Sequence, residues 1–159
     1  MKKQSDHQVR VEAFMLEAGQ NVPPRPTMPD EHTRLLRAKL ILEETLETIA
    51  ALGVDVRLEP DQDGNHSYPL LYDLLEFTIN NKPDFIEIVD GCADLSVVSI
   101  GTLSALGVYD YAILREVDQS NLNKFDPGGH RRDDGKWIKP PNWKPPQLAK
   151  IILEQIMGK

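Results

Sequence analysis

The sequence predicts an all-α fold, a four-helix-bundle-type core with minor hairpin or loop insertions. Apolar residues recur at helical spacing over several long segments. Proline and acidic residues stand at the starts of these segments and glycines at their ends, as expected for helix boundaries. At 159 residues the chain is long enough to bury an ordinary core, so we predict a single domain over residues 1–159.

The first two predicted helices are defined by their ends. A short amphipathic helix covers residues 8–18, and a proline-rich connector follows it. The second helix is predicted to run from about Met28 to Leu52, with Thr27 as its N-cap and Gly53 as its left-handed stop. The remaining predicted elements, in chain order, are a small hairpin or loop (54–69), a short helix (70–81), a long helix (82–107), a further helix (108–125), a short hairpin around Asp134-Gly135 and a C-terminal helix (145–157).

The composition limits the classes of function. The net charge is −7 and no basic stripe is present, so we expect no nucleic-acid partner. No segment approaches the length of a membrane span, and the N-terminal residues lack the apolar run of a signal peptide, so we expect no membrane partner. The single cysteine, Cys92, is typical of a reducing compartment and predicts a cytoplasmic protein. We expect Cys92 to behave as a small buried hydrophobic residue.

Carboxylates interrupt the apolar face of the second helix, within RAKLILEETLETIAALG (37–53). Glu43 and Glu47 continue a core-facing stripe that includes Leu40, and Glu44 lies beside them. Charged side chains in such a stripe are costly to bury unless a positive charge meets them. The pattern therefore raises the question of what that positive charge is.

The long helix carries a second acidic stripe, within FIEIVDGCADLSVVSI (85–100). Glu87, Asp90 and Asp94 follow the i, i+3, i+7 spacing of one helix face. The residues around them are mostly apolar, so we predict that most of this helix is buried. Gly91 interrupts the helix at a cost in helix propensity, which indicates a close contact with another helix.

If the two helices pack together, their acids converge, and like charges that close require compensation. Divalent cations with oxygen ligands supply it. We expect Mg²⁺, which leaves room for substrate phosphates, with Mn²⁺ as the alternative ion. Solvated helix faces are the other interpretation, and they are favoured for one stripe alone but not for both together. The predicted metal ligands are Glu43, Glu44, Glu47, Glu87, Asp90 and Asp94.

Three segments resemble a known family: LILEETLETIAALG, EIVDGCADLSVVSIGTLSALGV and EVDQSNLNKF. In this order they are similar to the all-α NTP pyrophosphatases, the MazG-like superfamily, whose members include dUTPase-like, dCTP pyrophosphatase-like and phosphoribosyl-ATP pyrophosphohydrolase-like enzymes. The family's ExxE pair is Glu44 and Glu47 here. Its later ExxD pair is Glu87 and Asp90. The resemblance covers about Arg10 to Lys124 and extends into GKWIKPPNW.

The resemblance implies a reaction and an assembly. The reaction is Mg²⁺-dependent hydrolysis of a nucleoside triphosphate to the monophosphate and pyrophosphate, in nucleotide-pool control. The expected substrate is a deoxynucleotide or non-standard nucleotide, and the expected assembly is a homo-oligomer, a dimer or tetramer. Glu44 and Glu47 are the catalytic candidates, because a carboxylate there could orient or deprotonate the attacking water. The segment 54–69 departs from compact members of the family and bears on the shape of the substrate pocket.

Five residues are candidates for substrate binding. By the resemblance, Asn121 and Lys124 contact the triphosphate, although a lysine near a helix end also complements the helix dipole. Arg37 contacts a phosphate or pairs with a nearby acid. Phe14 and Gln20 are candidates for contact with the base by the resemblance only.

Two other interpretations compete with an enzyme of this type. A non-catalytic bundle for nucleotide sensing or oligomerisation would bind metal and ligand without turnover. A carboxylate-bridged di-iron oxidase is disfavoured, because no histidine follows a glutamate at the Glu-x-x-His spacing. Trp137 and Trp143 are predicted to pack over the site or a subunit interface, which is more common than base stacking.

Overall fold

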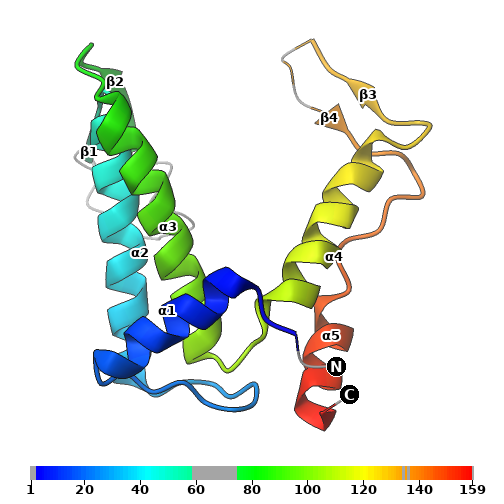
Figure 1. The fold of residues 1–159 in the computed structure, drawn as a ribbon. Helices are drawn as coiled ribbons and strands as arrows, with labels where there is room; N and C mark the ends of the chain where they lie inside the picture. The colour runs from blue at the N-terminus through cyan, green and yellow to red at the C-terminus, as the bar shows by residue number, and fades with distance from the viewer. Residues whose placement is uncertain (1–2, 59–74, 134, 136, 159) are drawn as a thin grey trace, which may run out of the picture. The chain divides into compact units, whose positions relative to one another are not determined.

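The computed structural model describes residues 3–58, 75–133, 135 and 137–158, and these residues are mainly helical (Figure 1). The chain forms two compact units: the first comprises Met1–Pro29 and Ile100–Lys159, and the second comprises Asp30–Ser99. The all-α fold class predicted from the sequence is confirmed. A single domain over residues 1–159 stays a prediction.

The second unit is built around two helices, α2 (Glu31–Ala51) and the larger part of α3 (Phe85–Ala105), which lie side by side (Figure 1). The helices touch where Gly91 meets Thr48. A Cβ built on Gly91 would lie 3.1 Å from Thr48 Cβ and 3.2 Å from Thr48 Cα. A side chain at this position would push the helices apart, so the close contact predicted at Gly91 is confirmed.

Helix α2 begins after Asp30, whose carboxylate accepts a hydrogen bond from the backbone N–H of Thr33 at 2.7 Å. This hydrogen bond lowers the pKa of Asp30. The predicted start at Met28, with Thr27 as the N-cap, is wrong. Met28 precedes a proline, which disfavours helical backbone at that residue. The backbone N–H of Thr27 instead donates to the carbonyl of Leu106 at 2.9 Å.

A two-stranded hairpin follows α2 in the second unit. The helix ends at Gly53, which has the predicted left-handed backbone with a φ of 75°. Strand β1 (Val54–Leu58) comes next and pairs antiparallel with strand β2 (Leu75–Ile79). The extended character predicted for the residues after Gly53 is therefore confirmed.

Strand β2 replaces part of a predicted helix. The helix predicted over 70–81 is wrong for residues 75–79, whereas residues 70–74 and the turn predicted at 63–64 lie outside the described residues. The sequence LEFTI contains an aromatic and two β-branched side chains, which suit a strand. Pairing with β1 satisfies its backbone groups, and this pairing overrides the local helical pattern.

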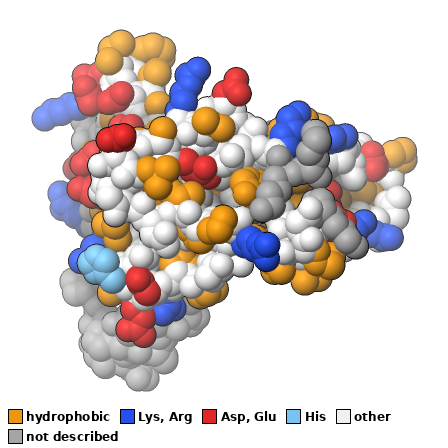
Figure 2. Space-filling view, turned by 60° about the horizontal axis from the view of Figure 1, so that its bottom comes forward, with side chains coloured by type: hydrophobic (Ala, Val, Ile, Leu, Met, Phe, Trp, Pro, Cys, Tyr) orange, Lys and Arg blue, Asp and Glu red, His pale blue; other side chains and the backbone are white. Residues whose placement is uncertain are grey.

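Helix α3 is less buried than predicted. Near its start, Phe85 is 75% exposed, Ile86 71% and Val89 55%. Cys92 is also exposed, so the prediction of a buried cysteine is wrong. Within the described part of the second unit, the other elements are α2 and a two-stranded hairpin. The side of α3 that carries Phe85, Ile86 and Val89 stays exposed to solvent. On the face of the molecule that Figure 2 shows, hydrophobic side chains lie at the surface between charged ones.

The first unit contains α1 (Asp6–Glu17), α4 (Asp110–Leu122) and the end of α3. Helix α4 lies within the segment predicted as helical, whereas α1 begins at Asp6, before the predicted start at residue 8. The hydroxyl of Ser5 caps α1 by accepting a hydrogen bond from the backbone N–H of Gln8 at 3.0 Å. Apolar side chains from all three helices and the turn before α4 are buried in this unit. They are Val11, Met15, Ile100, Ala105, Val108 and Ile113.

A buried polar network ties the start of α1 to the turn between α3 and α4. The side-chain amide of Gln8 donates to Ser104 Oγ at 3.1 Å and to the carbonyl of Val108 at 2.8 Å. Its carbonyl accepts from the backbone N–H of Asp110 at 2.8 Å. The Asp110 carboxylate accepts from the backbone N–H of Ser5 at 2.8 Å and from the Ser5 hydroxyl. Because every one of these buried groups is paired, the network holds the chain in one arrangement.

The C-terminal part of the first unit contains a hairpin and a helix. A short 3-10 helix, η2 (Asn123–Phe125), continues α4. Strands β3 (His130–Arg131) and β4 (Trp137–Ile138) pair antiparallel, which confirms the predicted short hairpin. Helix α5 (Leu148–Met157) packs against α4 and confirms the predicted C-terminal helix.

No single helix among the described residues has both the length and the apolar character needed to cross a membrane. Only the bent pair Phe85–Ala105 and Asp110–Phe125, counted together, meets that test of length and composition.

Candidate active site

The carboxylates predicted from the sequence gather where α2 meets α3. Glu44 is half-buried on α2, and Glu43 and Glu47 beside it are exposed. Burial raises the pKa of Glu44, and four neighbouring negative charges raise it further: Asp94, Glu47, Glu43 and Asp90. Two of these charges, Asp94 and Asp90, belong to α3, so carboxylates of the two helices are near enough to act on one another electrostatically.

The close contact between the helices produces this arrangement. Thr48 follows Glu47 directly on α2, and its hydroxyl donates to the carbonyl of Glu44 at 2.7 Å. Gly91 follows Asp90 directly on α3. The point where Gly91 meets Thr48 therefore lies close along the helices to Glu44 and Glu47 on α2 and to Asp90 and Asp94 on α3.

Glu87 stands apart from the grouped carboxylates. It is exposed, one turn before Asp90 on α3, and its charge is not among those that raise the pKa of Glu44. Its backbone N–H donates to the Asp84 carboxylate at 3.2 Å in the first turn of the helix. Its role as a metal ligand stays a prediction.

The grouped carboxylates suit a hard divalent cation by their chemistry. Carboxylate oxygens are the ligands that Mg²⁺ prefers, and a cation relieves the repulsion that raises the pKa of Glu44. Across the part of the chain that the structure describes, no three His, Cys, Asp or Glu side chains are close enough to hold one ion as they stand. Binding therefore requires side-chain rotation, for which the exposed Glu43 and Glu47 have room.

Three of the predicted substrate-binding residues lie on or beside α1 and α2. Arg37 is buried on α2, two turns before Glu44, and burial lowers its pKa. Phe14 is 63% exposed on α1, and Gln20 follows that helix, where its backbone N–H donates to the carbonyl of Met15 at 2.8 Å. Contact of these residues with substrate stays a prediction.

Asn121 and Lys124 form a pair at the C-terminal end of α4. The Lys124 ammonium donates to the Asn121 side-chain carbonyl at 2.7 Å, so the two residues share one helix face as predicted. The carbonyl of Lys124 accepts from the indole N–H of Trp137. Their contact with a triphosphate stays a prediction.

The structure places a further cation at this end of α4 that the sequence analysis did not select. The Lys139 ammonium lies 3.7 Å from the centroid of the Trp143 ring. The signal in the sequence is a lysine four residues before a tryptophan, separated from it by Pro-Pro-Asn. This spacing alone does not predict that the ammonium lies over the ring, because that depends on the turn that residues 140–142 form.

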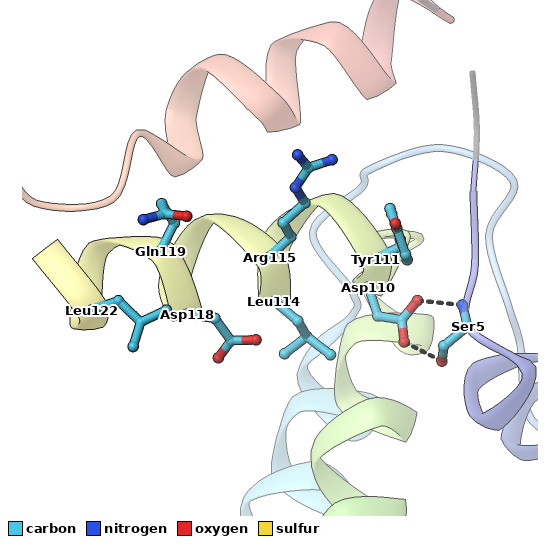
Figure 3. Close-up of a pocket in the computed structure, with 8 residues that line it drawn as sticks. All are labelled: Ser5, Asp110, Tyr111, Leu114, Arg115, Asp118, Gln119 and Leu122. Atoms are coloured by element: carbon cyan, nitrogen blue, oxygen red, sulfur yellow. Dashed lines mark hydrogen bonds between the residues drawn. The ribbon is translucent and has the colours of Figure 1, made fainter.

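A hollow of about 340 Å³ lies along α4 in the first unit (Figure 3). Ser5 and Asp110 line one end of it, where their two hydrogen bonds are formed, and Tyr111, Arg115 and Asp118 extend it along the helix. None of the residues that the sequence predicts for the active site lines this hollow.

A comparison with protein families decides the class of protein. The model of the phosphoribosyl-ATP pyrophosphohydrolase family matches residues 11–121. The chain belongs to this family. Phosphoribosyl-ATP pyrophosphohydrolases are part of the MazG-like all-α NTP pyrophosphatase superfamily, so the resemblance inferred from the motifs is confirmed. A comparison with curated proteins finds no match.

The phosphoribosyl-ATP pyrophosphohydrolase match covers the whole acidic cluster. It includes all six predicted acids as well as Phe14, Gln20, Arg37 and Asn121, and it ends before Lys124. The family hydrolyses a pyrophosphate bond in a nucleotide. Membership therefore makes the chain a pyrophosphohydrolase, a hydrolase that acts on phosphoric anhydrides.

The raised pKa of Glu44 predicts a pH-dependent effect on stability. Its pKa in the folded protein lies above the ordinary value of 4.5, so the fold favours the protonated carboxyl and loses stability as pH rises through this range. In metal-free protein, Glu44→Gln should therefore raise the melting temperature at about pH 7, and the gain should shrink towards about pH 4. Thermal unfolding in excess chelator at both pH values measures this effect.

Glu17→Gln is the matched control, because Glu17 is exposed on α1 and lies outside the acidic cluster. It should give no comparable change between the two pH values. A gain for Glu44→Gln that is the same at both pH values would contradict the electrostatic origin.

Proposed function

We propose that the protein hydrolyses a nucleoside triphosphate, with Mg²⁺, to the monophosphate and pyrophosphate. The observation that carries this proposal is the group of carboxylates at the contact between α2 and α3, in a member of a pyrophosphohydrolase family. A deoxynucleotide or non-standard nucleotide is the proposed substrate, and the role is control of the nucleotide pool. The family match favours phosphoribosyl-ATP as the second candidate substrate.

The proposed roles of the acids follow from their surroundings. Glu43, Glu44, Glu47, Asp90 and Asp94, with Glu87 one turn away, would hold the ion, which when bound supplies positive charge against the phosphates and acidifies water. Glu44 is half-buried, and its raised pKa makes it a better proton acceptor near neutral pH than an ordinary carboxylate. Glu44 or Glu47 would thus orient the attacking water and accept its proton.

The departing pyrophosphate carries several negative charges that need a positive partner. Lys124 offers an ammonium whose position is fixed by Asn121, and this pair would bind the leaving phosphates. Arg37 would act on the phosphates from α2, and Phe14 and Gln20 would contact the base. These roles rest on the family resemblance.

We also propose that the protein works as a homo-oligomer, a dimer or tetramer, in the cytoplasm. The single cysteine supports a reducing compartment. Large apolar side chains on the two acidic helices support self-association, because burial in a subunit interface would remove them from water. They are Leu35, Ile41, Leu42, Leu46, Phe85, Ile86 and Val89, all more than a third exposed.

Product analysis tests the bond that is cleaved. Phosphorus NMR of the reaction, run on the common ribo- and deoxyribonucleoside triphosphates and on phosphoribosyl-ATP, should show a monophosphate and pyrophosphate for the preferred triphosphate. Free orthophosphate with a nucleoside diphosphate would mean that the reaction is wrongly assigned. Binding of nucleotides without any turnover would instead favour a non-catalytic nucleotide-sensing bundle.

Metal removal tests the role of the acidic cluster. Excess chelator should abolish turnover, and it should lower the melting temperature of protein that has been loaded with Mg²⁺, because repulsion among the grouped carboxylates returns. Adding back Mg²⁺ or Mn²⁺ should restore both. If neither the melt nor the turnover changes with chelator, the acids do not hold a catalytic ion.

A further inference from the structure

Two ammonium groups lie against one indole ring at the C-terminal end of α4. Lys139 Nζ is 3.7 Å and Lys124 Nζ is 5.9 Å from the centroid of the Trp143 ring, so the two cations lie no farther apart than these distances combined. Among the residues that the structure describes, neither ammonium has a carboxylate within ion-pair distance. Two like charges within this range repel each other, and an anion bound near both would relieve that repulsion.

The Trp143 ring is held in place by its own hydrogen bonds. Its indole N–H donates to the carbonyl of Ser120 on α4 at 2.8 Å, and its backbone N–H donates to the carbonyl of Pro140 at 3.0 Å. The Ser120 hydroxyl in turn donates to the carbonyl of Lys144 at 3.2 Å. The Trp143 ring is therefore fixed against the last turns of α4. Because the Lys139 ammonium already lies over this ring, binding an anion would cost Lys139 little side-chain entropy.

Lys124 is fixed from the other side. Its ammonium donates to Asn121 at 2.7 Å, and its carbonyl accepts from the indole N–H of Trp137 on β4. The Trp137 ring also stacks at a tilt on Phe125, with the ring centroids 4.8 Å apart. The β3–β4 hairpin thus fixes the backbone at the end of α4 through Trp137. Lys124 is positioned by Asn121 and Lys139 by Trp143, so neither ammonium needs to be ordered when an anion binds.

We infer that Lys139, positioned by Trp143, is a second cation that binds the diphosphate part of the substrate together with Lys124. This inference rests on the proposed function for the identity of the anion. A compact ammonium is a strong partner for phosphate oxygens, and two of them match an anion with two linked phosphoryl groups better than one does. Both lysines lie beyond residue 121, where the family match ends.

Tryptophan fluorescence tests the inference without turnover or metal. Trp137 and Trp143 are the two tryptophans of the chain, so Trp137→Phe leaves Trp143 as the reporter of the site. Titration with inorganic pyrophosphate in excess chelator should give a saturable change in fluorescence, and sulfate at equal ionic strength should not. Lys139→Ala in this background should weaken pyrophosphate binding by about 10- to 100-fold, and Lys139→Arg should recover part of it.

Calorimetric titration of the protein that retains Trp137 repeats the measurement without altering the hairpin. The matched control is Lys150→Ala, an exposed lysine on α5, which should leave pyrophosphate binding unchanged. Equal binding by wild type and Lys139→Ala would overturn the inference, and so would a loss no larger than that of Lys150→Ala. Tighter binding of a DNA oligonucleotide than of pyrophosphate through Lys139 would overturn it as well.

The outcome separates this inference from the proposed function. Pyrophosphate binding that depends on Lys139, in a protein that turns over no triphosphate, would support the anion site and contradict the proposed reaction. Normal turnover with no effect of Lys139→Ala on pyrophosphate binding would leave the reaction standing and remove the second cation.

Discussion

Glu47→Gln and Asp90→Asn should each lower turnover by at least about 100-fold, because each removes a charge that the proposed metal site needs while preserving side-chain shape. The structure places both residues among the charges that raise the pKa of Glu44. Removing either charge therefore also relieves repulsion. The melting temperature of metal-free protein should stay equal or rise, while the stabilisation by added Mg²⁺ should be lost.

Steady-state kinetics and thermal unfolding of the same preparations measure these opposite effects. Glu31→Gln is the matched control, since Glu31 is an exposed acid at the start of α2, outside the cluster. Glu87→Gln adds a comparison within α3, because Glu87 is exposed and its charge is not among those acting on Glu44. Wild-type turnover in both Glu47→Gln and Asp90→Asn would make the cluster an ordinary solvated surface.

Lys124→Ala should lower kcat/KM by about 10- to 100-fold, since losing one charge-assisted contact costs about 1.5–3 kcal/mol. The Lys124 ammonium is held by Asn121, and in the proposed reaction it would offset charge on the departing pyrophosphate. Lys124→Arg keeps the charge but changes the geometry, so it should recover part of the loss.

The competing role of Lys124 is purely structural. A lysine after the end of α4 also complements the helix dipole, and its loss would then lower stability by a few tenths of a kcal/mol with catalysis intact. Measuring kcat/KM and the melting temperature of both variants, with Lys150→Ala as the control, distinguishes the two roles. If only the melt changes, Lys124 and Asn121 do not belong to the active site.

The sequence by itself determined where most of the helices lie and how the acids are spaced along them. Gly53 was predicted to end α2 because a left-handed residue after a periodic segment is a local property, and its φ of 75° agrees. Likewise, Glu44 and Glu47 share a face of α2 through helical spacing alone. The contact at Gly91 was also visible, because a glycine inside a helix is costly unless a neighbour needs its space.

Only the tertiary structure decided what depends on residues distant in sequence. Residues 75–79 read as helical on their own, and they form a strand because Val54–Leu58 pairs with them. Phe85 and Ile86 are exposed although they lie in an apolar stretch of sequence. Exposure depends on which elements pack on a helix, and periodicity does not specify those elements. Lys139 likewise gained significance only when Trp143 was seen seated on α4. Local propensity acts between residues within a few positions of one another, whereas strand pairing, burial and charge clustering arise between residues that only folding brings together.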